Sequence, residues 1–259
     1  MTRLSIAYAA AHGTDKGRTR DRNEDYVWVD DTAGAYVVAD GLGGHAAGDV
    51  ASRLAATTAG ELLVRGAPEA AGLSTAAIEQ AMTGAIEAAN ARVWAAAEDG
   101  AQDRRMGAVI VAALVRPPNA YVTHAGDCRG YLARDSKIIR LTEDDSVVAQ
   151  LIAAGELTEE AARDDPRRHF VTKVIGQERP VQASFAQVAL EPGDWLLLCS
   201  DGLWDMVDDD GILRELHRAG GDPKEAVKGL IDAANAAGGT DNISVVAIRM
   251  LAPEDEGGS

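Results

Sequence analysis

Four aspartates stand where predicted β-strands end or begin. Asp40 follows the apolar run 35–39, Asp127 follows the run 120–124 and a short turn, and Asp201 follows the run 195–199. Asp241 comes just before the run 243–248. A single Asp-Gly pair after a strand is typical of an ordinary turn. Four such positions together predict one shared rim of carboxylates, because in an antiparallel sheet the end of one strand lies beside the start of its neighbour.

Carboxylates gathered at one rim need a counter-charge. They cannot all ionise a few Å apart unless a cation neutralises them. Oxygen ligands without a supporting cluster of cysteines or histidines indicate a hard ion, Mg²⁺ or Mn²⁺. The sequence has no loop with EF-hand spacing, which disfavours Ca²⁺.

A second charged cluster lies near the start of the chain. It combines two arginines with three acids in the run Arg20-Asp21-Arg22-Asn23-Glu24-Asp25. Taken alone, such a run is typical of a solvated surface. Beside a metal site it has another interpretation, because the planar fork of an arginine binds phosphate oxygens through two hydrogen bonds. These residues by themselves leave both interpretations open.

Composition and charge narrow the class of protein. The chain has 259 residues, with 41 acidic and 25 basic side chains and a net charge of −16. The hydrophobic fraction of 46% indicates a globular protein. The negative charge argues against nucleic acid or an anionic membrane as partner. The longest apolar run, 106–115, is only half of the about 20 residues that a membrane span needs.

Two cysteines, Cys128 and Cys199, are too few for a disulfide framework or a zinc cluster. This usage fits a reducing compartment, so we expect a cytoplasmic protein. The start of the chain, residues 3–11, faintly resembles a short signal peptide, but we expect an opening strand there instead.

The elements that must position the aspartates alternate between helices and strands. Apolar spacing predicts helices over about 46–65 and 75–98, and a third from Asp222 to the Gly238-Gly239 pair. Strands are expected over 35–39, 109–115, 120–124, 195–199 and 243–248, with a mixed helical stretch over 146–163. This order indicates an α+β fold with helices on the outer faces of antiparallel sheets. We expect a single domain over 1–252 and a polar tail over 253–259.

Six segments, in this order along residues 13–247, resemble the metal-dependent Ser/Thr protein phosphatase family of the protein phosphatase 2C type, in its bacterial branch. The segments are Arg20-Asp21-Arg22-Asn23-Glu24-Asp25, Asp40-Gly41-Leu42-Gly43-Gly44-His45, Gly126-Asp127-Cys128-Arg129-Gly130-Tyr131, Val171-Thr172-Lys173-Val174-Ile175-Gly176, Cys199-Ser200-Asp201-Gly202-Leu203-Trp204-Asp205 and Thr240-Asp241-Asn242-Ile243-Ser244. One Asp-Gly pair would be a weak signal, whereas six segments in the family's order are specific.

The resemblance implies a four-layer α-β-β-α sandwich, with two antiparallel sheets flanked by helix pairs and with Mn²⁺ or Mg²⁺ at one edge. It implies that Asp40 bridges two ions and that Gly41 offers its carbonyl oxygen to one of them. Asp201 and Asp241 would bind the other ion. In the bacterial branch, residues matching Asp127 and Asp201 share a third ion.

The resemblance also implies the reaction and the remaining roles. Glu24 and Asp25 would act through metal-bound waters, and Arg20 would bind the phosphate. Water activated by two metals would attack phosphorus directly, so that no protein nucleophile is needed. His45 is a candidate acid for the leaving alkoxide, although a helix-start position or a metal-bound water are alternatives. The implied partners are phosphorylated proteins and a Ser/Thr kinase whose action the enzyme reverses, and we expect a monomer.

One short segment departs from the family's pattern, and the role of one arginine pair stays open. The family often has two small hydroxyl residues after Met-Gly, where this chain has Ala108 and Val109 following Met106-Gly107. The region 146–169 corresponds to a flap beside the active site. Its arginine pair, Arg167 and Arg168, either contacts an acidic phosphopeptide or belongs to a solvated turn.

Three other functions stay open at this stage. Cys128 and Arg134 have the Cys-x5-Arg spacing of cysteine-dependent phosphatases, although Asp127 beside the thiol disfavours the required thiolate. A non-catalytic phosphopeptide-binding module on the same fold would be expected to lack the metal carboxylates. A metal-dependent phosphatase of small molecules would keep them, since the sequence does not reveal the substrate.

Overall fold

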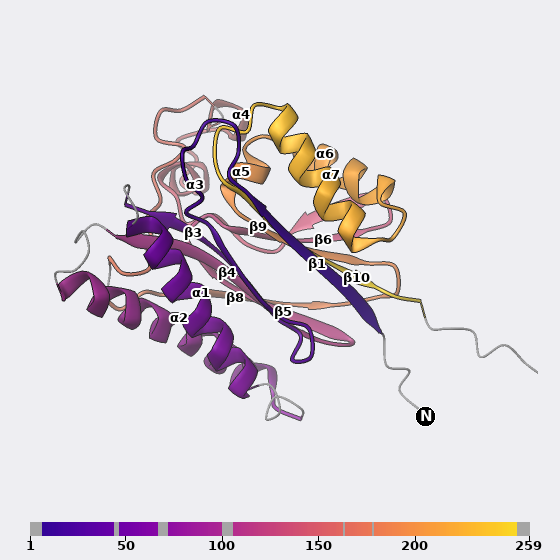
Figure 1. The fold of residues 1–259 in the computed structure, drawn as a ribbon, viewed down its shortest axis with the longest axis horizontal. Helices are drawn as coiled ribbons and strands as arrows, with labels where there is room; N and C mark the ends of the chain where they lie inside the picture. Colours follow the sequence, from indigo (N-terminus) through magenta and orange to yellow (C-terminus); the bar gives the residue numbers. More distant parts are fainter. Residues whose placement is uncertain are drawn as a thin grey trace, which may run out of the picture.

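The chain folds into two antiparallel sheets of five strands each, as Figure 1 shows. The computed structural model describes residues 7–43, 47–66, 72–99, 106–162, 164–177 and 179–252. The first sheet has the order β1 (Tyr8–Asp15), β10 (Ile243–Met250), β9 (Trp195–Cys199), β6 (Arg129–Arg134) and β7 (Lys137–Arg140). The second has the order β2 (Tyr26–Asp30), β3 (Ala35–Leu42), β4 (Gly107–Arg116), β5 (Asn119–Ala125) and β8 (Ser184–Ala189).

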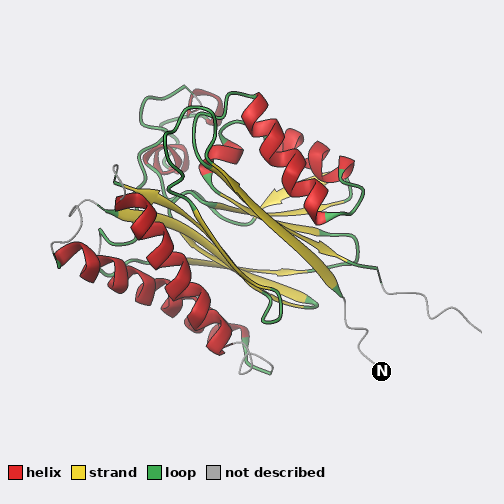
Figure 2. Ribbon diagram, in the orientation of Figure 1, coloured by secondary structure: helices red, strands yellow, loops and turns green. Residues whose placement is uncertain are grey.

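Helices cover the outer face of each sheet (Figure 2). The pair α1 (Ala47–Gly66) and α2 (Thr75–Glu98) packs on the second sheet, and α6 (Asp209–Arg218) with α7 (Pro223–Ala236) packs on the first. Three short helices, α3 (Val147–Ala153), α4 (Glu159–Ala162) and α5 (Asp201–Trp204), lie at the upper end of Figure 1. The expected four-layer α-β-β-α sandwich is therefore confirmed.

The two-residue period of the strands divides the core into layers. In β3, Val37 and Ala39 face the helix pair α1–α2, whereas Tyr36 and Val38 point into the space between the sheets. All four side chains are fully buried. Alternation of this kind lets one strand supply two cores. Alanines along the buried face of α1 let that helix approach the sheet closely.

Most predicted elements are present, with local differences. The predicted helix 75–98 has the bounds of α2, and β9 has the predicted bounds 195–199. The strand expected to stop before Asp40 instead continues as β3 to Leu42. The mixed stretch 146–163 forms α3 and α4, although its last residue lies outside the described residues, as does the tail 253–259. Strands β2, β7 and β8 were not predicted.

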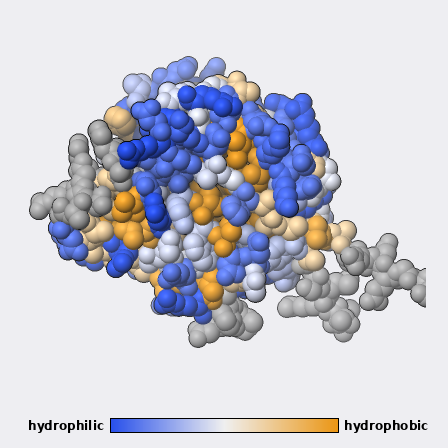
Figure 3. Space-filling model, in the orientation of Figure 1, coloured by the Kyte–Doolittle hydropathy of each residue, from blue (hydrophilic) through white to orange (hydrophobic). Residues whose placement is uncertain are grey.

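The surface in Figure 3 is mostly hydrophilic over the upper half of the view, where the β1–β2 connection and α7 lie. This agrees with the excess of acidic residues. No helix in the described ranges is long and apolar enough to cross a membrane.

Candidate metal centre

The structure brings the four predicted aspartates together. Asp40 lies within β3 opposite Val109 of β4, and Asp127 lies in the turn between β5 and β6. Asp201 is the first residue of α5, directly after β9, and Asp241 stands two residues before β10. The negative charges of the other three each raise the pKa of the Asp40 carboxyl, after the larger effect of its burial. The predicted convergence on one rim is thus present in the fold.

Asp25 joins this rim as a fifth carboxylate, and it is only 8% exposed. The Ser200 hydroxyl donates a 2.7 Å hydrogen bond to Asp25 Oδ2. Burial, with a contribution from the charge of Asp241, raises the pKa of Asp25 to about 6. Its second oxygen, Oδ1, is buried and has no hydrogen-bond partner.

The electrostatics of the rim require positive charge. Burial, together with the charge of Asp144, raises the pKa of Asp127 to about 7. Burial and the charges of Asp127 and Asp241 also raise the pKa of Asp201 well above its usual range. The Asp201 Oδ1 atom, like Asp25 Oδ1, is buried without a partner. Orphaned carboxylate oxygens are costly unless a cation binds them, so the residues fit a hard divalent ion.

Within the described residues, no three acidic, histidine or cysteine side chains are placed closely enough to enclose an ion as they stand. The guanidinium of Arg20 lies against one of the rim carboxylates. Its Nη2 atom lies 2.5 Å from Asp241 Oδ2 and pairs with this carboxylate. The Ser200 hydrogen bond similarly engages one oxygen of Asp25. Binding of an ion at Asp241 would therefore require the Arg20 side chain to move.

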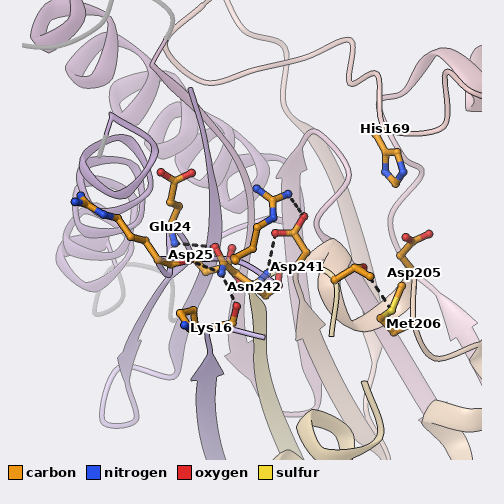
Figure 4. Close-up of polar contacts among 12 residues, drawn as sticks. Lys16, Glu24, Asp25, His169, Asp205, Met206, Asp241 and Asn242 are labelled. Carbon is orange, nitrogen blue, oxygen red and sulfur yellow. Dashed lines mark hydrogen bonds and ion pairs between the residues drawn. The ribbon is translucent and has the colours of Figure 1, made fainter. Parts of the chain in front are cut away.

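Asn242 organises the N-terminal cluster around the rim (Figure 4), a role that the sequence analysis missed. Its amide nitrogen donates to the carbonyl oxygens of Lys16, at 2.9 Å, and Arg22, at 2.8 Å. Its side-chain oxygen accepts a 2.8 Å hydrogen bond from the backbone N–H of Glu24. One asparagine thereby ties the loop that carries Arg20 to the start of β10. From the sequence, the Asp241-Asn242 pair indicated only the start of a strand after a turn.

Two glycines permit close backbone approach at the rim. A Cβ atom on Gly41 would lie 2.2 Å from the carbonyl oxygen of Gly48 at the start of α1. A Cβ atom on Gly202 would lie 2.0 Å from the carbonyl oxygen of Asn242. A side chain at position 41 would push β3 away from the start of α1, and one at position 202 would push α5 away from the segment that carries Asp241. This explains physically why Gly follows Asp40 and Asp201.

Glu24 is not brought into the carboxylate group. The carboxylate of Glu24 points away from Asp25 and Asn242 in Figure 4. Its backbone is held firmly, because its carbonyl oxygen accepts a 2.6 Å hydrogen bond from Ser52 of α1. His45 lies outside the described residues.

The turn that carries Asp127 is fastened on two sides. Trp204 Nε1 donates a 3.0 Å hydrogen bond to the carbonyl oxygen of Asp127. Asp145 accepts a hydrogen bond from the backbone N–H of Gly126 and pairs with Lys173 at 2.7 Å. Sequence reasoning did not identify Trp204, Asp145 or Lys173 as supports of this turn.

The cysteine-dependent alternative does not fit the geometry. Cys128 is fully buried, and burial together with the charge of Asp40 raises the pKa of its thiol well above the usual range. The residues that follow it form strand β6 rather than a phosphate-binding loop at a helix N-terminus. A buried, protonated thiol is a poor nucleophile.

The flap arginines have partners within the protein. Arg167 pairs with Asp165 of its own turn at 2.8 Å, and Arg168 lies 3.6 Å from Asp205. The side chains of Arg167 and Arg168 are 46% and 42% exposed, which agrees with the solvated-turn interpretation. The departure at Ala108 leaves its backbone paired with Ile175.

Comparison with known proteins extends these observations. The family model described as "Protein phosphatase 2C" matches residues 12–230. The Serine/threonine phosphatase stp of Listeria innocua is 36% identical over 239 residues, which cover 91% of this chain and 93% of that protein.

Solved structures of Ser/Thr phosphatases are also similar to this chain. The serine/threonine phosphatase PstP/Ppp of Mycobacterium tuberculosis superposes with a TM-score of 0.85 at 33% identity, covering 95% of this chain and 99% of that one. The catalytic domain of serine threonine protein phosphatase PstP in complex with 2 manganese ions gives a TM-score of 0.82 at 31% identity, covering 96% and 100%. With sequence and fold in agreement along nearly its whole length, the chain belongs to the protein phosphatase 2C family, the metal-dependent Ser/Thr protein phosphatases, and to its bacterial branch.

Proposed function

We propose that this protein removes phosphate from phosphoserine and phosphothreonine side chains of proteins, by direct attack of water at the carboxylate rim. The observation that carries the proposal is the interacting set of five aspartates, two of which have a buried oxygen without a partner. Such carboxylates repel one another when ionised, and divalent cations relieve that repulsion. The family assignment and the relatives named as Ser/Thr phosphatases support the same reaction.

The ligand set that we propose is the one that the family resemblance implies for the rim residues. Asp40 would be shared by two ions, with the Gly41 carbonyl on one of them. Asp201 and Asp241 would hold the other. A third ion would be shared by Asp127 and Asp201.

Around these ligands, Asp25 and Glu24 would act through ordered water. Asp25 is suited to this because its buried carboxylate is already oriented by Ser200. Glu24 would need to rotate toward the rim from the position drawn in Figure 4.

Bound Mn²⁺ or Mg²⁺ would activate water and stabilise charge on the phosphoryl group. Arg20 would then bind the phosphoryl oxygens after leaving Asp241. Its side chain is 51% exposed, so it can turn toward a substrate without disturbing the core. His45 would donate the proton that the leaving serine or threonine oxygen requires.

We further propose that residues 1–252 form one catalytic domain, that the protein is a cytoplasmic monomer, and that its substrates are targets of a cognate Ser/Thr kinase. The two buried, unpaired cysteines support a reducing compartment. A small-molecule phosphatase and a non-catalytic phosphopeptide-binding module are the alternatives to be tested.

The test is phosphate release from a phosphothreonine peptide, compared with an aryl phosphate and a sugar phosphate, in Mn²⁺, in Mg²⁺ and in chelator. We expect metal-dependent turnover with the highest kcat/KM on the peptide. A higher kcat/KM on the sugar phosphate would favour the small-molecule alternative. Peptide binding without turnover in Mn²⁺ would favour the non-catalytic module.

A further inference from the structure

A wide groove leads away from the rim on the side of α3, α4 and α6. Its volume is about 1190 Å³, and Asp127 lines the end at the rim. Small-molecule pockets usually have volumes of about 300–1,000 Å³. A groove of this size that begins at the reacting centre is better suited to a segment of polypeptide than to a compact metabolite.

The walls of the groove provide both apolar and charged contacts. Ile152 of α3 and Met206, just after α5, contribute apolar surface. The remaining lining is rich in charge, with arginines and carboxylates on facing elements. The elements that form it gather at the same end of the molecule in Figure 1.

Each arginine of the groove lies beside a carboxylate of the groove itself, although Arg129 and Arg140 share Asp144. Each of the four lies within 4 Å of an aspartate, at distances from 2.6 to 3.9 Å. The pairs are Arg129 and Arg140 with Asp144, Arg168 with Asp205, and Arg214 with Asp208. Arg129 is also held over the Trp204 ring, with its guanidinium carbon 3.6 Å from the ring centroid. These arginines therefore already have carboxylate partners within the protein.

The net charge that remains in the groove is negative, because three carboxylates that are unpaired among the described residues outweigh the one arginine that shares Asp144. Glu143, Asp209 and Asp210 line the groove and are exposed, and none of them forms an ion pair with another residue in the described part of the chain. The two aspartates lie in the first turn of α6, where they also favour the helix dipole. Glu143 lies on the connection between β7 and α3, where no helix dipole accounts for it. Unbalanced negative charge on two separate elements is complementary to a basic ligand.

We propose that this groove binds the residues flanking the phosphorylated side chain, and that it favours substrates with arginine or lysine beside the phosphosite. The proposal rests on the proposed function, because the phosphoryl group must sit at the Asp127 end. The phosphate and the basic flank would then meet opposite charges, cations at the rim and carboxylates in the groove.

The test compares three phosphothreonine peptides that differ only in their flanks, which are alanine, arginine or glutamate. In Mn²⁺, kcat/KM for the arginine peptide should exceed that for the alanine peptide by about two- to thirtyfold, the effect expected of one or two partly exposed ion pairs. The advantage should shrink at high salt, because exposed charges are screened. Turnover of the alanine peptide tests the proposed function separately. Equal values for the three peptides, or a preference for glutamate, would overturn the inference.

A matched pair of double variants separates the groove from the overall charge of −16. Asp209→Asn with Asp210→Asn removes two charges from the groove, and Glu79→Gln with Glu87→Gln removes two from exposed positions of α2. The first should lower the arginine-to-alanine ratio several-fold, whereas the second should leave it unchanged. If the ratio fell equally in the two double variants, the net charge of the protein would cause the preference, and the groove proposal would be wrong. Glu143→Gln provides a second groove variant outside α6 should the first fail to fold.

Discussion

Replacing Arg20 by alanine should change metal binding and catalysis in opposite directions. Arg20 Nη2 lies 2.5 Å from Asp241 Oδ2, with 51% and 27% of the two side chains exposed. An ion pair this exposed contributes about 0.2–1 kcal/mol, so its removal should tighten an ion at Asp241 by about 1.4- to 5-fold. A charged hydrogen bond to phosphate contributes about 1.5–3 kcal/mol, so kcat/KM should fall by about 10- to 150-fold.

The assay combines calorimetric titration with Mn²⁺ and steady-state hydrolysis of a phosphothreonine peptide at saturating Mn²⁺. Arg20→Lys should recover part of the catalytic loss, because an ammonium keeps the charge but not the planar fork. Arg22 is the matched control, since its side chain is exposed and forms no ion pair within the described ranges. The assignment would be refuted by a silent Arg20→Ala together with a larger loss in Arg22→Ala. Loss of Mn²⁺ binding in Arg20→Ala would refute the competition between Arg20 and the ion.

Four further results are expected. In chelator, the pKa of about 6 for Asp25 lies above its unfolded value of about 3.9, so the folded state binds more protons and stability should fall as pH rises from about 4 to 7. Melting curves should show this fall, and a rise would contradict it. Asp25→Asn should make the fall smaller, and the raised pKa values of Asp40, Asp127 and Asp201 should account for the part that remains. Asn242→Ala removes three side-chain hydrogen bonds of a residue that is 4% exposed. It should lower the free energy of unfolding in urea by about 1.5–4.5 kcal/mol, and a change below about 0.5 kcal/mol would argue against its organising role. Asp127→Ala should slow turnover while calorimetry still detects two Mn²⁺ ions; loss of all binding would contradict its assignment to a third ion. Cys128→Ser and Cys199→Ser should keep most of the phosphatase activity, because burial raises the pKa of both thiols; a drop of several orders of magnitude would revive a thiolate mechanism.

The sequence was most informative where a local pattern and the tertiary structure agree. The apolar spacing of 75–98 defined α2 because one face of that helix is buried from Ile78 to Ala97. The aspartates at strand ends predicted the rim because the strands are long and antiparallel, so their ends meet. The prediction that the strand ends before Asp40 was wrong, because β3 continues to Leu42, which pairs with Gly107 of β4.

The strands that were missed lack a clear apolar pattern. Every residue of β2 is only partly buried, and β7 is mostly exposed at the edge of its sheet. Local periodicity carries little signal in such strands, because pairing with a neighbour decides their structure. Contacts between residues far apart in the sequence could not be predicted from local patterns either. Arg20 meets Asp241 across 221 residues of sequence, and Ser200 meets Asp25 across 175.

The central claim is that the aspartate rim binds the divalent ions on which the reaction depends. Calorimetric titration of chelator-treated protein with Mn²⁺, in parallel with the Asp40→Asn variant, tests it most directly. The account predicts at least two ions per chain in the unsubstituted protein and loss of the shared site in the variant. A protein that binds no Mn²⁺, or a variant that binds as many ions with the same affinity, would contradict it.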